Sequence, residues 1–332
     1  MSSSVKSVFP LGFPWQTQDP FLFCVYHLDH YPKGNEDMSP NAPLTGRNLG
    51  NDFTIKDGWR MYHGQTIPGF PSHPHRGFET VTIVNKGFCD HSDSLGAAGR
   101  FGEGDVQWMT AGRGVQHSEM FPLLNTEAEN PLELFQIWLN LPKKAKFVDP
   151  HFAMLWHEDI PIVKTEGSEV KVIAGNYLGT KAPRPAPDSW AADSENDVAI
   201  LNIHLAPNTT YTLPKTSTEV SRTLYFYEGD KIEIEGKEIT PNHGIELVAS
   251  KETAIKVGNA TAHFLLLQGK PIAEPVVQHG PFVMNTQDEI RATMKEYGTT
   301  QFGGWPWQYL DNVHAKEKGR FAKYPDGTLV TK

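Results

Sequence analysis

The sequence predicts an all-β chain built from two β-barrel domains. Short runs of β-branched and aromatic residues alternate with polar residues and end at glycine, proline or asparagine, a pattern typical of strands. No long helical period separates these runs, and many short strands with turn signals indicate a sandwich or closed barrel. With 332 residues, of which 39% are apolar, the chain is long enough for two domains that each bury a core.

The expected strands occur in both halves of the chain. They cover residues 78–83, 132–139, 169–174, 198–205, 222–227, 231–234, 253–257 and 263–267. Two comparable series suggest an internal duplication of one barrel unit, a hypothesis that rests on pattern alone because no residue-level repeat supports it.

The stretch from Lys181 to Asp197 has the proline and polar content of a linker or long loop. We therefore place the domain change there and expect an N-terminal domain over residues 1–180 and a C-terminal domain over 190–332. The second should include a helix that begins after Thr286, because Thr286 and Glu289 form a capping box and Ile290, Met294 and Tyr297 follow as an apolar stripe.

Aromatic residues from Phe302 to Trp307 follow this helix and should pack on a domain surface. Residues 31–69 hold many proline, glycine and asparagine residues and read as an extended loop. That loop is expected either to cover a site as a lid or to be a surface excursion.

Composition excludes several classes of protein. A net charge of −9 disfavours direct nucleic-acid binding, which needs a basic face. The apolar runs are too short for a membrane span, and the N-terminal residues do not resemble a signal peptide. Two cysteines without a CxxC pair indicate a reducing compartment, the cytoplasm or, in a eukaryote, also the nucleus.

Two histidine pairs carry the strongest chemical signal. His73 and His75 stand at positions i and i+2, and His117 and Glu119 repeat that spacing in a glycine-rich stretch. Side chains at i and i+2 of a strand project from one face, so each pair can hold a metal ion. Three imidazoles and one carboxylate leave two positions open on a six-coordinate ion, which favours iron, copper, nickel, manganese or zinc in a reactive site.

Other candidates near these pairs are weaker. Glu79 follows the first pair, and His27 with Asp29 would share a face if that segment is a strand, although no second pair accompanies them. Ser118 alternates to the face opposite His117, so it is not a nucleophile candidate.

The blocks at residues 73–82, 104–119 and 274–287 resemble the pirin family of the cupin superfamily. The resemblance implies a bicupin, two β-barrels packed together, with one iron ion (Fe²⁺, or another divalent transition metal) in the N-terminal barrel and no metal in the C-terminal barrel. Its pattern assigns the carboxylate role to Glu119 and leaves Glu79 to orient a histidine. The implied metal ligands are His73, His75, His117 and Glu119.

The resemblance also implies a function. Several pirin-like proteins resemble quercetinases, which open flavonols with dioxygen, and Glu119 would then be a fixed ligand or the catalytic base for the 3-hydroxyl. Phe78 and Trp108 would line the pocket for a flat substrate or belong to the barrel core. The alternatives are an iron-dependent transcription cofactor that binds a regulatory protein partner, and an enzyme acting on another small phenolic or carbonyl compound.

Overall fold

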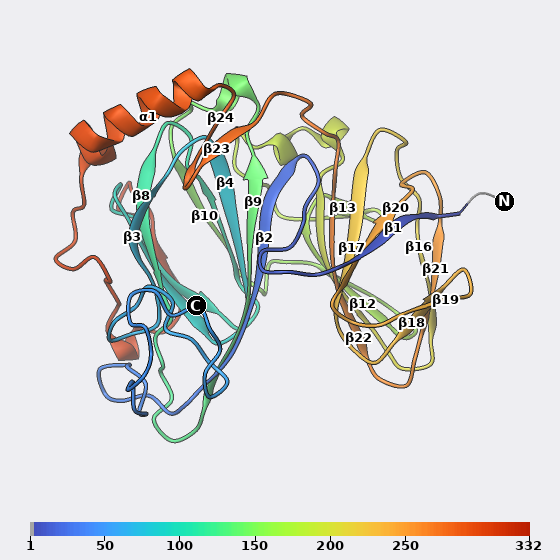
Figure 1. Ribbon diagram of the computed structural model, residues 1–332, viewed down its shortest axis with the longest axis horizontal. Coiled ribbons are helices and arrows are strands. Elements are labelled where there is room, and N and C mark those ends of the chain that lie inside the picture. Colours follow the sequence, from blue (N-terminus) through green and yellow to red (C-terminus); the bar gives the residue numbers. More distant parts are fainter. Residues whose placement is uncertain (1–2) are drawn as a thin grey trace. The chain divides into compact units, whose positions relative to one another are not determined.

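Strands make up most of the regular structure in the computed structural model, which describes residues 3–332 (Figure 1). Two compact units are present. One contains the described residues up to 25 together with 137–140 and 158–273, and the other contains 26–136, 141–157 and 274–332. We call the latter the histidine barrel and the former the second barrel. No helix within residues 3–332 has the length and hydrophobicity needed to cross a membrane.

Two antiparallel sheets form the histidine barrel. The five-stranded sheet has the order β10-β7-β4-β9-β2, with β2 Phe21–Tyr31, β4 Phe78–Lys86, β7 Val106–Thr110, β9 Asn130–Asn140 and β10 His151–Leu155. The six-stranded sheet has the order β26-β25-β6-β5-β8-β3, with β3 Gly69–His75, β5 Phe88–Asp93, β6 Ala98–Gly102, β8 Val115–Met120, β25 Phe321–Lys323 and β26 Leu329–Thr331.

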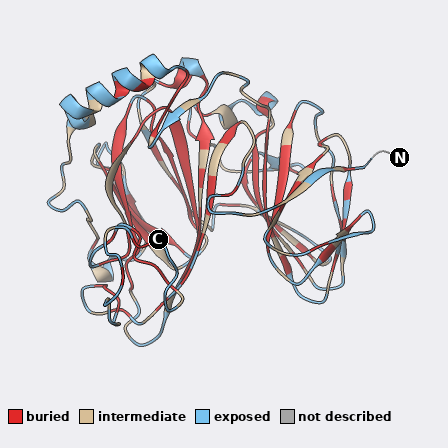
Figure 2. Cartoon of the chain, viewed as in Figure 1, coloured by how far each residue is buried: buried red, intermediate tan, exposed pale blue. Residues whose placement is uncertain are grey.

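The buried residues of the histidine barrel fall into an apolar group and a polar group. One buried cluster is apolar and includes Val84, Phe101, Leu134 and Phe152. Other buried positions on the same strands are polar, and most of the strand residues are shielded from solvent (Figure 2). Because a buried polar group must find a partner, this polar region is where a site is expected.

The second barrel also has two main sheets. The seven-stranded sheet has the order β1-β20-β17-β22-β15-β12-β11, with β1 Val5–Pro10, β11 Ile162–Thr165, β12 Ser168–Ala174, β15 Ala199–Leu205, β17 Ser221–Glu228, β20 His243–Leu247 and β22 Ala262–Gly269. The four-stranded sheet has the order β16-β21-β18-β19, with β16 Thr210–Leu213, β18 Ile232–Ile234, β19 Lys237–Ile239 and β21 Thr253–Val257. The strands expected in both halves are therefore present.

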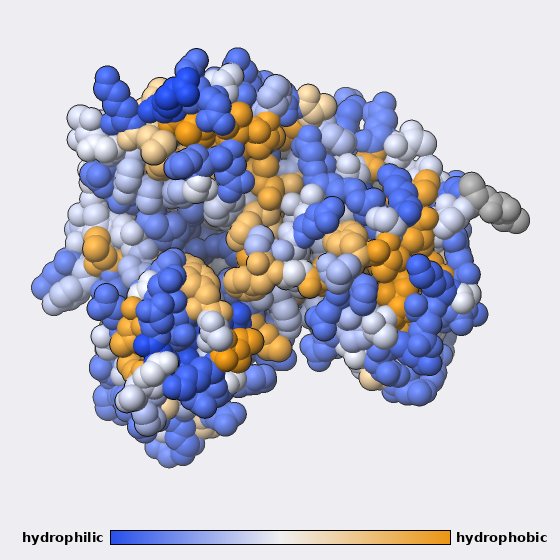
Figure 3. Space-filling view, in the orientation of Figure 1, coloured by the Kyte–Doolittle hydropathy of each residue, from blue (hydrophilic) through white to orange (hydrophobic). Residues whose placement is uncertain are grey.

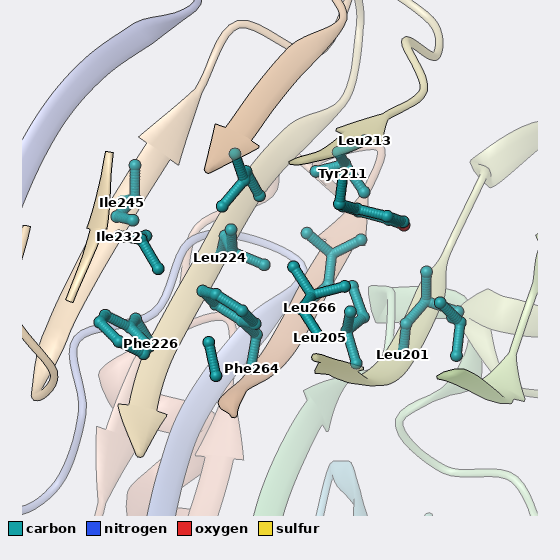
Figure 4. Close-up of a cluster of buried hydrophobic side chains, with 14 of the residues drawn as sticks. Leu201, Leu205, Tyr211, Leu213, Leu224, Phe226, Ile232, Ile245, Phe264 and Leu266 are labelled. Atoms are coloured by element: carbon teal, nitrogen blue, oxygen red, sulfur yellow. The ribbon is translucent and has the colours of Figure 1, made fainter. Parts of the chain in front are cut away.

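Apolar cross-strand pairs fill the core of the second barrel (Figure 4). Leu224 pairs with Leu266 and Phe226 pairs with Phe264 across β17 and β22. The rings of Phe226 and Phe264 stack with centroids 5.0 Å apart. Such same-face pairs explain why alternating apolar residues in this half form a closed core.

The units differ from the division expected at residues 180–190. Strand β1 pairs with β20 inside the second barrel (Figure 1), whereas β25 pairs with β6 inside the histidine barrel. The C-terminal helix and tail thus belong to the unit that carries the histidine pairs. Strand periodicity reports which face of a strand is buried, but it does not report which distant strand completes the sheet.

Helix α1, Gln287–Thr300, begins at the expected capping box, since Thr286 accepts from the Glu289 amide and the Glu289 side chain accepts from Thr286. Its outer face is hydrophilic (Figure 3). Ile290 is buried as expected, but the stripe was wrong at Met294, which is 45% exposed while Thr293 is buried. Two short hairpin strands, β23 Val277–His279 and β24 Phe282–Met284, precede the helix, and a further pair, β13 Asn176–Tyr177 and β14 Thr180–Lys181, lies in the second barrel.

Candidate metal centre

Strands β3 and β8 bring three histidines together. They pair antiparallel with His73 opposite His117, and the register shifts between Phe70 and His73. The ring nitrogens of His73, His75 and His117 that could act as ligands all lie within 4.8 Å of one another. The i, i+2 spacing on β3 and the cross-strand register together form a three-histidine group that could hold a metal ion.

The three imidazoles are held in the neutral form that metal ligation requires. Burial lowers the pKa of His73 to about 4, and it also moves the pKa of His75 and of His117 well below the usual histidine value. The rings are close, with the centroids of His73 and His117 4.5 Å apart. Three neutral imidazoles thus face one another without mutual charge repulsion.

Hydrogen bonding shows which nitrogens remain for an ion. His73 Nδ1 lies 2.9 Å from the Pro71 carbonyl oxygen, and because a carbonyl only accepts, Nδ1 carries the proton and Nε2 keeps a lone pair. Both ring nitrogens of His117 are buried and make no hydrogen bond. A buried nitrogen without a partner is costly, so this environment fits a metal ion.

Glu119 lies beside the three histidines but is held by two neighbouring side chains. Its Oε1 is 2.9 Å from Thr82 Oγ1, and its Oε2 accepts a hydrogen bond of 2.6 Å from Gln136 Nε2. Oε2 is also 3.8 Å from His117 Nε2. Burial raises the pKa of the Glu119 carboxyl, and the hydrogen bonds from Thr82 and Gln136 oppose that rise.

Thr82, Gln136 and Glu119 form a ring that can accommodate a proton. Thr82 Oγ1 is also 2.7 Å from Gln136 Oε1, yet a hydroxyl donates only one hydrogen bond. When Glu119 is protonated, its own hydroxyl can donate to Thr82, Thr82 donates to Gln136, and Gln136 donates back to Glu119. The sequence pattern did not single out Thr82 and Gln136, although both stand in expected strands.

The structure places Glu79 in a different set of contacts. It is fully buried, and its Oε1 accepts hydrogen bonds from Trp108 Nε1 at 3.2 Å and Thr110 Oγ1 at 2.8 Å. Side chains alternate along β4, so Glu79 lies on the face opposite Thr82. Glu79 and Glu119 are both absent from the metal-competent groups found within residues 3–332, and only the three histidines of the expected ligand set are grouped.

Phe78 and Trp108 occupy different surroundings, although both are buried. The ring centroid of Phe78 lies 5.0 Å from that of His75, so Phe78 is a neighbour of the histidine group. Trp108 is held by Glu79 through its indole nitrogen. Ser118 is buried and alternates with His117 and Glu119 along β8, as expected for a residue on the opposite face.

His27 and Asp29 are both buried on β2, but they bind protein groups. Tyr62 Oη donates to Asp29 Oδ2 at 2.6 Å and lies 2.8 Å from His27 Nδ1. Arg60 contacts both oxygens of Asp29 at 3.0 Å. These bonds tie the segment between β2 and β3, which was expected to be a loop, to the barrel interior.

The bend that follows His75 is anchored by the C-terminal helix. Arg76 is 2% exposed and donates to both carboxylate oxygens of Glu296 at 2.7 Å. Its Nε donates to the Arg113 carbonyl oxygen. The buried Lys146 ammonium, whose pKa is lowered to about 8 chiefly by burial, donates to the carbonyls of Gly77 and Val283.

The aromatic stretch after the helix packs on the barrel, as expected. Trp307 Nε1 donates to the Asp93 carbonyl oxygen at 2.8 Å. Phe302 lies against Gly114, where an added Cβ would approach the phenyl ring to 2.7 Å. The tail therefore packs against the end of β5 and against the residue that precedes β8.

The fold and the histidine group define a bicupin, a chain of two cupin barrels in which one barrel has a metal-competent triad. The chain belongs to the pirin family. The pirin model matches residues 15–139, and the model of the pirin C-terminal cupin domain matches residues 200–303.

The relatives of this chain are named either as pirins or as quercetin 2,3-dioxygenases. A pirin from Arabidopsis thaliana is 39% identical over 239 residues, 71% of this chain and 78% of its own. A candidate quercetin 2,3-dioxygenase from Pseudomonas aeruginosa is 38% identical over 235 residues, 70% of this chain and 79% of its own. Among solved structures, quercetin 2,3-dioxygenase from Acinetobacter baumannii superimposes with a TM-score of 0.71 at 25% identity, covering 92% of this chain and 99% of that one.

Proposed function

We propose that this protein is an iron-dependent oxygenase of the quercetin 2,3-dioxygenase type, which opens a flavonol with dioxygen. Its metal ligands would be His73, His75, His117 and Glu119. The observation that carries the proposal is His117, whose two buried ring nitrogens lack hydrogen-bond partners within a group of three neutral histidines. Similarity to proteins named quercetin 2,3-dioxygenase supports the choice of reaction.

The divalent ion would supply Lewis acidity and a place where a flavonol oxygen and dioxygen can meet. The protein's part is to keep the three imidazoles neutral and converging, as their burial does. Phe78 is buried beside His75, so it supports the imidazole from within the barrel core. Much of the rate gain would then come from positioning rather than from a protein nucleophile.

Glu119 is the residue that we assign to the proton of the flavonol 3-hydroxyl. A carboxylate whose pKa is raised by burial accepts a proton more readily than one in water. The proton would stand on Oε1 and be donated to Thr82 Oγ1, while Gln136 Nε2 continues to donate to Oε2. Every polar atom needed to hold the neutral acid is therefore already in place.

The test is an aerobic assay of iron-loaded protein with quercetin, with carbon monoxide and consumed dioxygen measured together. Turnover should vanish in His73→Ala and fall strongly in Glu119→Ala, whereas His279→Ala, at an exposed histidine on β23, should behave as wild type. Elemental analysis of protein purified without added metal identifies the ion. Stoichiometric iron without turnover would reject the oxygenase and favour iron-dependent binding of a regulatory protein.

A further inference from the structure

Several buried polar atoms inside the histidine barrel have no hydrogen-bond partner. They include Thr80 Oγ1, Gln107 Oε1 and the two ring nitrogens of His117, and all three side chains are no more than 1% exposed. Native proteins pair almost all such atoms, so each exception requires an explanation such as a bound ion, water or ligand. A bound metal ion would account for one ring nitrogen of His117, but it would not account for Gln107.

Two independent contacts place Gln107 near the metal centre. It stands directly opposite Thr82 in the β4–β7 ladder, and opposite residues share a face of the sheet. Thr82 in turn contacts Glu119. On its other side, Gln107 Nε2 lies 3.4 Å from His91 Nδ1, and the His91 ring centroid is 5.5 Å from that of His117.

The orientation of the Gln107 amide is fixed by a chain of hydrogen bonds. Asp93 Oδ1 accepts from the amides of Leu95 and Ala97 at 2.9 Å, and Asp93 Oδ2 lies 3.2 Å from His91 Nε2. A carboxylate only accepts, so His91 Nε2 donates to Asp93, and His91 Nδ1 faces the Gln107 Nε2 group, which only donates. Gln107 therefore turns its NH₂ group toward His91 and its carbonyl oxygen away.

His91 itself is held rigidly. Its ring stacks on Phe152 with centroids 5.1 Å apart and an interplanar angle of 23°. The Gln107 amide, which His91 orients, is therefore held in one position and does not rotate freely. The remaining Gln107 oxygen is a buried acceptor without a partner, on a residue that shares a sheet face with Thr82, and its lone pairs are left for a hydroxyl donor.

We propose that Gln107 is a specificity-determining residue, whose side-chain oxygen accepts a hydrogen bond from a hydroxyl group of a polyhydroxylated aromatic substrate held at the histidine group. The inference rests on the proposed function and adds to it the substrate group that Gln107 recognises, which is a hydroxyl. Substrates without a hydroxyl at that place leave the Gln107 oxygen buried and unpaired, which is the costly state.

The experiment compares dissociation constants for quercetin and for 3-hydroxyflavone, which lacks the four other hydroxyls of quercetin. Binding is followed by fluorescence quenching in the metal-loaded protein, so turnover is not needed. Gln107→Met keeps the length of the side chain and removes its acceptor, and the affinity ratio between the two flavonols should fall about tenfold. His91→Phe, which preserves the stack on Phe152 but releases the amide, should lower the ratio in the same direction.

A matched control is Gln278→Met, at an exposed glutamine on β23, which should leave the ratio unchanged. Near-ultraviolet circular dichroism and metal content establish that each variant is folded and loaded. If Gln107 contacts only an ordered water, both flavonols change equally and the ratio in Gln107→Met stays at the wild-type value, which overturns the inference alone. Failure of the wild-type protein to bind either flavonol overturns the proposed function and this inference with it.

Discussion

Gln136 Nε2 donates a hydrogen bond of 2.6 Å to the Glu119 oxygen that lies 3.8 Å from His117 Nε2. The near oxygen of the carboxylate is therefore fixed by β9, while Thr82 on β4 holds the far one. Two strands of one sheet thus aim a carboxylate carried by the other sheet at the histidine group. Hydrogen-bond partners of a ligand commonly control metal affinity, and in the proposed site Gln136 and Thr82 would do so through Glu119.

Removing either partner of Glu119 should weaken metal binding. Gln136→Leu and Thr82→Val each take away a donor that lowers the Glu119 pKa, so the carboxyl binds its proton more tightly and the ion must displace it. We expect a loss of about 10- to 100-fold in affinity, measured by competition with a chelator. The loss should shrink as pH rises, because the competing proton is then absent.

Glu119→Gln is the matched control, since it cannot ionise and its metal affinity should lack the part of the pH dependence that the Glu119 proton contributes. A deficit in Thr82→Val that is the same at pH 6 and pH 8 would contradict this account of the ring.

Acid should destabilise the metal-free protein before most carboxylates titrate. Burial lowers the pKa of His73 to about 4 and that of His27 to about 3, both below the value of about 6.5 in an unfolded chain. At pH values between the folded and the unfolded pKa of these histidines, the unfolded state binds more protons than the folded state. The free energy of unfolding therefore falls as pH drops from about 6.5 toward 4. Urea unfolding at a series of pH values measures the slope.

His27→Gln should flatten that slope, because it removes one histidine that titrates only after unfolding. The exposed His279→Ala should not change it. An equal slope in wild type and His27→Gln would show that burial does not hold His27 neutral.

Arg76 should matter far more to stability than its partner Glu296. Arg76 is buried, whereas the Glu296 side chain is 49% exposed. Arg76→Met also removes the bond to the Arg113 carbonyl and should cost about 3 kcal/mol. Glu296→Gln should cost no more than about 1 kcal/mol, because solvent screens an exposed partner. Equal costs by chemical denaturation would refute this asymmetry.

The C-terminal tail should stabilise the histidine barrel through Arg100. This fully buried side chain pairs with Asp90 at 2.7 Å, and it also donates to the carbonyls of His314 and Ala315. Deleting residues 304–332 leaves these donors unpaired, at a cost of about 3–5 kcal/mol. Deleting only residues 324–332, which removes β26, should cost much less. Hydrogen exchange in β5 and β6 reports the difference.

Local pattern was enough to predict the eight strand runs and the helix cap, because each depends on residue spacing along one element. The convergence of His73 and His75 with His117 also needs the register between β3 and β8, and the resemblance to the pirin family supplied that expectation. Local pattern was not enough for Thr82 and Gln136, whose role depends on which strands face each other. Met294 was misplaced for a similar reason, since the helix is anchored through Thr293 and Glu296 to Arg76 and not by an apolar stripe alone.

The pairing of β25 with β6 has a consequence for biosynthesis. During translation β6 emerges from the ribosome more than two hundred residues before its neighbour. Both strands that carry the histidines can form early in a nascent chain, but the sheet to which they belong gains β25 and β26 only after residues 321–331 have been made. Stable capture of an ion should therefore be a late event in the maturation of this polypeptide.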